Sequence, residues 1–170
     1  KQLSGLTGHI EEVGYPYDTV MWGKSDDGCK WYDFEQVAYY IDGYLRLGIL
    51  LDNKDIINEV SDIIYNVIFN ADSDGYIGPK VLKNSTGWER WPHVVFFRAV
   101  LALFEYNKDK RILDALTNYY LKSDFKYIQQ RDVFNVEIML KLYDYTKSEN
   151  LLSLAISSYD IPEFTVKTPV

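Results

Sequence analysis

The stretch LALFEYNKDKRIL, residues 101–113, decides the fold, because two other stretches of the chain repeat its pattern. They are LRLGILLDNKDII at 45–57 and LKLYDYTKSENLL at 140–152. In each copy, leucines at the first and third positions lead into a polar turn, and Asn, Asp or Ser stands at the ninth position. These three residue types cap helix N-termini by accepting a backbone N–H hydrogen bond. Each copy therefore predicts a helix, a tight turn and a second helix, which gives three helical hairpins.

Apolar residues are spread differently over the two helices of each hairpin. They run nearly all round residues 94–104 and are abundant over 37–51 and 133–145, which predicts inner helices covered on several sides. The second helices carry apolar residues on one stripe only, which predicts outer helices. We expect an all-α fold of antiparallel helical hairpins with little or no sheet. Its six helices should lie near residues 33–51, 54–71, 91–106, 110–122, 131–146 and 149–159.

Alternating inner and outer helices are typical of an α-solenoid or of a closed toroid of helical hairpins. The ninth positions of the three copies, 53, 109 and 148, lie 56 and 39 residues apart. Such unequal spacing disfavours a solenoid, whose repeats stack with a near-constant period. The sequence thus favours part of a toroid of six hairpins, (α/α)6, with residues 1–170 forming a single domain.

The composition excludes several classes of partner. With 25 acidic residues against 18 basic ones the net charge is −7. A nucleic-acid partner, which needs clustered Lys and Arg, is therefore not expected. The longest apolar run, residues 94–104, is shorter than the roughly 18 residues of a membrane helix, so we expect no membrane partner. Cys29 is the only cysteine, which leaves no multi-cysteine metal site in the chain.

Residues 70–81 partly match a calcium-binding EF-hand loop. Asn70, Asp72 and Asp74 stand at ligand positions of such a loop, but Val81 replaces the bidentate glutamate of its last position. We therefore expect no metal here. The stretch should instead be a helix end that turns, through Asp74 and the glycine after it, into an ordered loop.

Residues suited to bind a sugar gather where the inner helices begin. The loops that lead into these helices should emerge on one rim, and five side chains there are candidates for substrate binding: Glu35, Trp88, Arg90, Trp91 and His93. Aromatic faces can pack against a sugar while polar groups fix its hydroxyls, so the rim predicts a pocket for a neutral, hydroxyl-rich ligand. Two alternatives stay open. The helix macrodipole alone favours an acidic residue such as Glu35 in a first turn, and His93 is either a ligand contact or a core histidine.

Four segments carry a resemblance to a known family. WYDFEQVAYYIDG at 31–43, DGYIGP at 74–79 and RWPHVVFFRAV at 90–100 resemble the N-terminal half of the catalytic domain of bacterial beta-L-arabinofuranosidase-type glycoside hydrolases. QLSGLTGHIEE at 2–12 resembles the segment that enters that domain. The resemblance implies a toroid of six helical hairpins around a central sugar pocket, of which this chain would hold three. It also implies that His93, in the RWPH segment, contacts the sugar from the rim.

The same resemblance implies a cysteine nucleophile beside a zinc ion held by cysteines and a glutamate, with a second glutamate as acid/base. No residue of this chain matches the nucleophile or the zinc ligands, and Cys29 lies in a different segment. We therefore expect the catalytic residues beyond Val170 and no cofactor in this chain, with zinc only in the full-length protein.

The expected function is part of a glycoside hydrolase that acts on an arabinofuranoside or a related glycan, periplasmic, secreted or cytoplasmic, with this chain alone inactive. The alternatives are a non-catalytic helical-repeat module that binds a peptide or glycan, and a toroid epimerase or lyase that uses rim histidines as bases. A half-ring would leave apolar side chains partly uncovered at its two ends, so we expect self-association or marginal stability. The residues concerned are Leu3, Leu6, Ile10, Leu151, Leu154 and Ile161.

Overall fold

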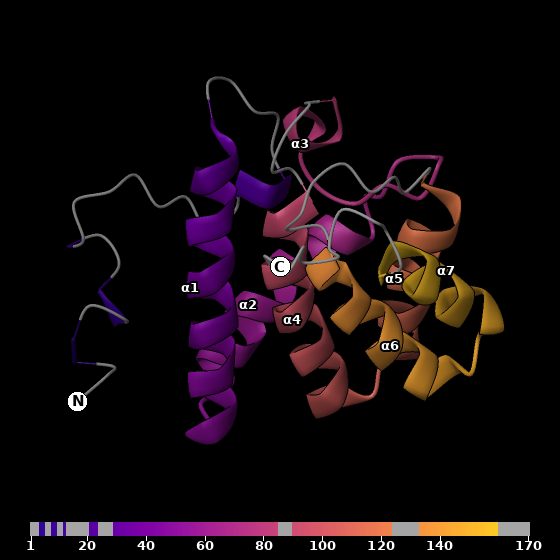
Figure 1. Cartoon of the computed structure of the whole chain (residues 1–170). Helices are drawn as coiled ribbons and strands as arrows, with labels where there is room; N and C mark the ends of the chain where they lie inside the picture. The colour runs from indigo at the N-terminus through magenta and orange to yellow at the C-terminus, as the bar shows by residue number, and fades with distance from the viewer. Residues whose placement is uncertain are drawn as a thin grey trace, which may run out of the picture.

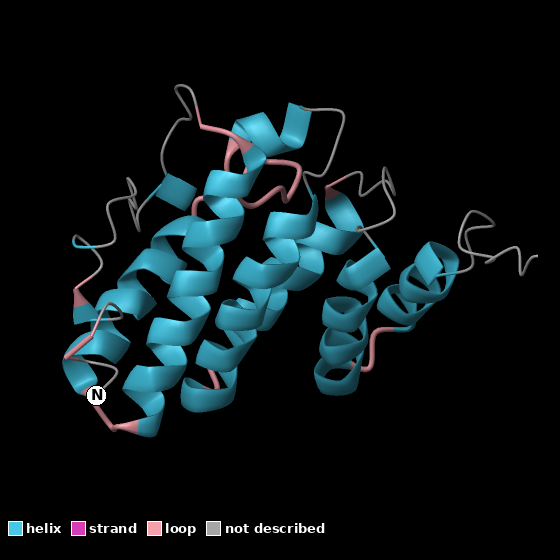
Figure 2. Cartoon of the chain, turned by 60° about the vertical axis from the view of Figure 1, so that its left-hand side comes forward, coloured by secondary structure: helices cyan, strands magenta, loops and turns pink. Residues whose placement is uncertain are grey.

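The structure, a computed structural model, describes residues 4–5, 8–9, 12, 21–23, 29–84, 90–123 and 133–159. Over these residues it contains seven α-helices, short 3-10 segments and no strand. Figure 2, in which helices are cyan, shows this all-helical architecture. The predicted all-α class is therefore confirmed. Among the helices described, none combines the length and the apolar content that crossing a membrane requires.

The three predicted hairpins are present, with ends within a few residues of those expected. Each joins an inner helix to an outer helix through a turn of two or three residues. The pairs are α1 (Trp31–Leu50) with α2 (Lys54–Ile68), α4 (Arg90–Asn107) with α5 (Lys110–Lys122), and α6 (Asn135–Thr146) with α7 (Glu149–Tyr159). Two further short helices, η3 (Met21–Gly23) and α3 (Lys80–Asn84), were not predicted.

The three inner helices form one layer, with outer helices α2 and α5 on one side of it and α7 beside α6. In Figure 1, α1, α4 and α6 stand side by side from left to right, with α2 and α5 behind them. All three inner helices begin at the upper end of this view, where α3 also lies. The middle helix, α4, packs against both α1 and α6, and thirteen of its eighteen residues are buried. Because neighbouring helices cover α4 on several sides, residues 94–104 are apolar nearly all round.

The hairpin turns are built alike, which supports the alignment of the three repeats. Asn53 caps α2 by accepting hydrogen bonds from two backbone N–H groups, and Asp109 caps α5 by accepting one from Arg111. The residue before the cap position has a left-handed backbone in every turn: φ is 50° at Asp52, 59° at Lys108 and 57° at Lys147. Residues other than Gly, Asn and Asp rarely adopt this backbone conformation. Its recurrence at the eighth position of each copy shows that the repeats share a turn geometry as well as a sequence pattern.

Helices α1 and α2 approach closely at one glycine. A Cβ atom added to Gly48 would lie 2.7 Å from the Cγ2 methyl of Ile56 and 3.3 Å from Cγ1 of Ile57. Because branched isoleucine side chains are stiff and packed, neither group can move away cheaply. The lack of a side chain at position 48 therefore sets how closely the first hairpin closes.

The loop that resembles an EF-hand is closed by a lysine. Asp74 accepts a hydrogen bond from the backbone N–H of Tyr76, and Gly75 has a φ of 85°, so the predicted turn is confirmed. The Lys83 ammonium lies 2.7 Å from Oδ2 of Asp72 and 2.7 Å from Oδ2 of Asp74. The loop thus carries its own cation between the two carboxylates. In the part of the chain that the structure describes, no three His, Cys, Asp or Glu side chains are grouped as metal ligands would be.

The expected uncovered end of the third hairpin is only partly present. Leu151 is fully buried, so the prediction that it is partly uncovered is wrong. Leu154 is partly buried and packs against the core, so it does retain some exposed surface. On α7 the apolar exposure falls instead on Ile156 and Tyr159, which are 53% and 67% exposed. The other residues of that prediction, Leu3, Leu6, Ile10 and Ile161, lie outside the described residues.

Candidate functional site

Of the five predicted binding residues, the four that the structure describes do not share one surface. Trp91 and Glu35 are partly exposed, whereas Arg90 is 6% exposed and His93 has no exposed surface. Each residue of an α-helix turns the side-chain direction by about 100°, so Trp91 and His93 point to nearly opposite sides of α4. Trp88 lies outside the described residues.

Glu35 and Trp91 meet between the first two turns of α1 and the first turn of α4. The indole Nε1 of Trp91 donates a hydrogen bond to Oε1 of Glu35, and the two atoms are 2.6 Å apart. This bond joins two of the residues that the sequence placed at the rim. A carboxylate with two oxygens accepts more than one hydrogen bond, so it can hold an indole and a ligand hydroxyl together.

Phe134 completes this arrangement from the third inner helix. It stands directly before α6 and is 47% exposed. Its ring meets that of Trp91 edge to face, with centroids 5.0 Å apart and planes at 67°. The sequence pattern does not single out Phe134, although a position at the start of an inner helix is the signal that could have found it. We call Glu35, Trp91 and Phe134 the aromatic site; each comes from the beginning of a different inner helix.

A band of paired charges crosses the three inner helices farther along their length. Asp42 and Arg46 of α1 pair at 2.8 Å, and the Arg46 guanidinium donates to the backbone oxygen of Arg98 on α4 at 3.5 Å. Arg98 in turn pairs with Glu137 of α6 at 2.6 Å, and Lys141 pairs with the same carboxylate at 3.0 Å.

This band shares a face with the aromatic site. Asp42 follows Glu35 by seven residues and Arg98 follows Trp91 by seven, while Glu137 follows Phe134 by three. Helical residues at these spacings lie on one side of their helix. The inner layer therefore presents one continuous face, aromatic at the helix beginnings and charged farther along.

The charge state of Glu137 limits what this band can do chemically. Partial burial raises the pKa of the Glu137 carboxyl, but hydrogen bonds from Arg98 and Lys141 outweigh this effect and hold the pKa below its ordinary value. The carboxyl is thus ionised at neutral pH and suits an acceptor or a positioning group, whereas a general acid needs a raised pKa.

His93 belongs to the core, and the prediction that it contacts a sugar at the rim is wrong. Its Nε2 lies 2.8 Å from the carbonyl oxygen of Ile77, which can only accept, so Nε2 carries a proton and donates. The imidazole stacks on Tyr119, with centroids 5.2 Å apart and planes at 25°. Other aromatic rings meet it at steeper angles, those of Trp22, Tyr76 and Phe97.

Arg90 is also a core residue, because its side chain is buried against aromatic rings. Its Nη1 donates to the hydroxyl of Tyr119 at 2.6 Å. The guanidinium carbon lies 5.4 Å and 5.6 Å from the ring centroids of Tyr119 and Tyr76, a distance at which cation–π attraction is significant. Arg90 and His93 together tie the loop before α3 to α4 and α5, so they support the rim from inside and are not on its surface.

Comparisons with protein-family models, with curated proteins and with solved structures found no match for this chain.

Proposed function

We propose that this chain binds a neutral glycan at the aromatic site and forms part of an α/α-toroid glycoside hydrolase. The observation that carries the proposal is the meeting of Trp91, Phe134 and Glu35 at the beginnings of three neighbouring inner helices. Two rings at a steep angle offer an apolar wall to the C–H face of a sugar, and the carboxylate beside them accepts a hydroxyl hydrogen bond.

The arrangement of the hairpins supports a toroid. Three inner helices run side by side in one direction, and each packs against its own outer helix. Adding three more such hairpins would close the inner layer into a ring, with the aromatic site on the ring's inner face. This is the same architecture that the resemblance to arabinofuranosidase-type enzymes implies, so an arabinofuranoside or a related glycan is the proposed substrate.

We propose that the nucleophile and the acid/base lie beyond Val170. Glycosidic hydrolysis requires a proton donor as well as a nucleophile or base. Of the two glutamates described above, Glu137 is held ionised by Arg98 and Lys141. Glu35 accepts from the Trp91 indole and suits a binding role. The 170-residue chain should therefore bind saccharide without turnover.

The site supports the two alternative functions to different degrees. A toroid epimerase or lyase that uses His93 as its base is not proposed, because the imidazole is fully buried. A non-catalytic glycan-binding module would use the same aromatic site. The continuation of the gene beyond Val170 separates it from the hydrolase: three more hairpins with a glutamate and clustered cysteines favour the enzyme, and a stop codon favours the module.

Calorimetric titration with neutral oligosaccharides, including arabinofuranosyl ones, tests the binding site. Trp91→Ala should weaken binding at least tenfold, equivalent to about 1.4 kcal/mol, because it removes both the apolar wall and the partner of Glu35. Phe69→Ala is the matched control, since Phe69 is an aromatic residue 46% exposed at the end of outer helix α2. Equal affinity of the Trp91→Ala variant and the parent chain, or no heat with any saccharide at millimolar concentration, would overturn the proposal.

A further inference from the structure

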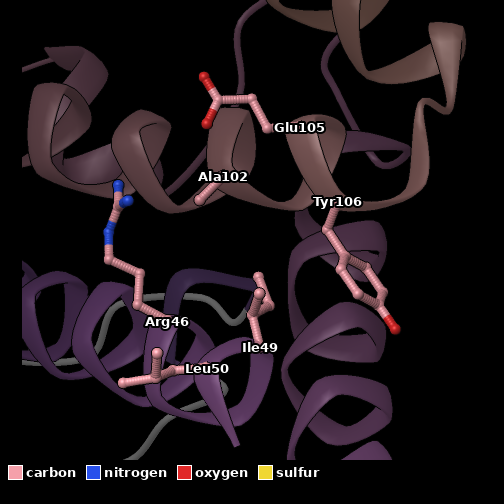
Figure 3. A pocket seen from close by; sticks show the side chains of 6 residues that line it. All are labelled: Arg46, Ile49, Leu50, Ala102, Glu105 and Tyr106. Atoms are coloured by element: carbon pink, nitrogen blue, oxygen red, sulfur yellow. The ribbon is translucent and has the colours of Figure 1, made fainter. Parts of the chain in front are cut away.

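A groove lies between the C-terminal ends of α1 and α4, away from the aromatic site. Its volume is about 590 Å³, and it is lined by Arg46, Ile49, Leu50, Ala102, Glu105 and Tyr106 (Figure 3). Glu105 follows Trp91 by fourteen residues on α4, which places the groove about 21 Å farther along that helix at a rise of 1.5 Å per residue. The groove is thus a separate feature from the proposed glycan site.

Uncovered apolar side chains surround this groove. Leu50 is 80% exposed and the next residue, Leu51, is 51% exposed, while Tyr106 on the opposite wall is 39% exposed. A protruding leucine pair beside a hollow is poorly suited to enclosing a small molecule. Contiguous exposed apolar surface of this kind marks protein–protein contacts.

The two walls of the groove carry opposite charges that are held in place. Figure 3 shows Arg46 reaching from α1 toward α4. Its guanidinium is fixed by Asp42 and by the backbone oxygen of Arg98, and its side chain remains 52% exposed. Glu105, on α4, accepts a hydrogen bond from the Tyr145 hydroxyl at 3.0 Å. One positive and one negative group therefore flank the same hollow.

This charge pattern is complementary to itself. In a contact between two identical chains around a twofold axis, the same patch meets its own copy, so each residue i that meets j is matched by j meeting i. Arg46 can then face the partner's Glu105, and Glu105 the partner's Arg46, without like charges meeting. The protruding Leu50 lies beside the hollow that would receive the partner's Leu50.

We propose that the groove is a self-association surface, through which two copies of this chain dock around a twofold axis. Leu50 of each copy occupies the groove of the other, and Arg46 of each pairs with the partner's Glu105. The proposal does not depend on the glycan function, because the groove and the aromatic site lie at different ends of the inner helices.

Charge reversal tests both the contact and its symmetry. Analytical ultracentrifugation of the parent chain should show a monomer–dimer equilibrium. Arg46→Glu and Glu105→Arg should each weaken dimerisation at least tenfold, since each places like charges on both sides of the twofold axis. An equimolar mixture of the two variants should dimerise again. In that mixed pair the introduced glutamate faces the introduced arginine across one half of the interface, and the native pair remains in the other half.

Two controls separate docking from folding. Lys110→Glu and Asp114→Lys reverse exposed charges on outer helix α5 and should leave dimerisation unchanged. Leu50→Ser should weaken dimerisation without lowering the melting temperature, because Leu50 is already 80% exposed. Arg46→Glu places a second carboxylate four residues after Asp42, which opposes folding of α1. The mixture remains informative in that case, because dimerisation returns only if residues 46 and 105 meet across the interface. A parent chain that stays monomeric at several hundred micromolar, or a mixture that stays monomeric, would overturn the proposal and leave the groove to a different partner.

Discussion

Replacing His93 by alanine should destabilise the fold and leave sugar binding unchanged. The imidazole has no exposed surface and is enclosed by aromatic rings, so its removal leaves a cavity in the core. Large-to-small substitutions in cores cost about 2–5 kcal/mol. The change also removes the donor that reaches the Ile77 carbonyl oxygen, which costs a further 1–3 kcal/mol or so. Because imidazole is a small ring, the lower part of each range applies, giving a total of about 4 kcal/mol.

Thermal unfolding followed by circular dichroism measures this cost. For a chain of this length about 1 kcal/mol lowers the melting temperature by roughly 2–4 °C, so the His93→Ala variant should melt roughly 10 °C below the parent chain. His93→Gln keeps an amide N–H near the place of Nε2 and should recover part of the loss. Calorimetry on the folded His93→Ala variant should give the saccharide affinity of the parent. A melting temperature within about 2 °C of the parent, or a tenfold loss of affinity in a variant that is still folded, would refute the placement of His93 in the core.

Three further results are expected. Gly48→Ala should lower the free energy of unfolding by about 1–2 kcal/mol in urea titration, because the added methyl meets the isoleucine of α2, although alanine is the better helix former; an unchanged midpoint would contradict the close approach of the two helices. Hydrogen bonds from Arg111 hold the pKa of Asp109 at about 2, below its ordinary value near 3.9. The ionised Asp109 therefore stabilises the folded state above about pH 4, and this contribution to the free energy of unfolding is lost as the pH falls toward 2. The loss should reach about 1 kcal/mol, given screening of the exposed Arg111, and Asp109→Asn, which keeps the cap, should remove that part of the acid dependence. Lys83→Met should bring the pKa of Asp74, which the Lys83 ammonium lowers, up toward its ordinary value in a carboxyl NMR titration; an unchanged pKa would show that the lysine does not close the loop.

The repeat pattern predicted the fold because its signals are local. The cap residues Asn53 and Asp109 and the leucines before them act within a single turn, so their spacing alone located the hairpins. One boundary differs where no cap residue marks it, because Phe134, at the N-cap position of α6, makes no side-chain cap hydrogen bond. The helix expected from residue 131 begins as α6 at Asn135, after a 3-10 turn at residues 133–134. Helix α3 has only five residues, too few to show a periodic pattern.

The candidate site was only partly predictable because a sequence does not show which way a helix is rotated. Trp91 and His93 are two residues apart and both start an inner helix, yet the packing of α4 against α5 turns His93 inward and leaves Trp91 toward α1 and α6. Phe134 was missed because an aromatic residue within an apolar run resembles core. Only the edge-to-face contact with Trp91 shows that its ring belongs to the site.

The indole region of a ¹⁵N–¹H NMR spectrum tests most directly whether a glycan binds at the aromatic site. The chain has four tryptophans, and two of them make a matched pair of probes. The Nε1–H of Trp91 donates to Glu35 on the partly exposed inner face, whereas that of Trp22, which is 1% exposed, donates to the backbone oxygen of Phe34 in the core. On titration with a neutral arabinofuranosyl oligosaccharide, the Trp91 signal, assigned from its loss in Trp91→Phe, should shift in a saturable manner while the Trp22 signal stays in place. A Trp91 signal that does not move while the saccharide binds elsewhere, or that does not move at any concentration reached, would contradict the account.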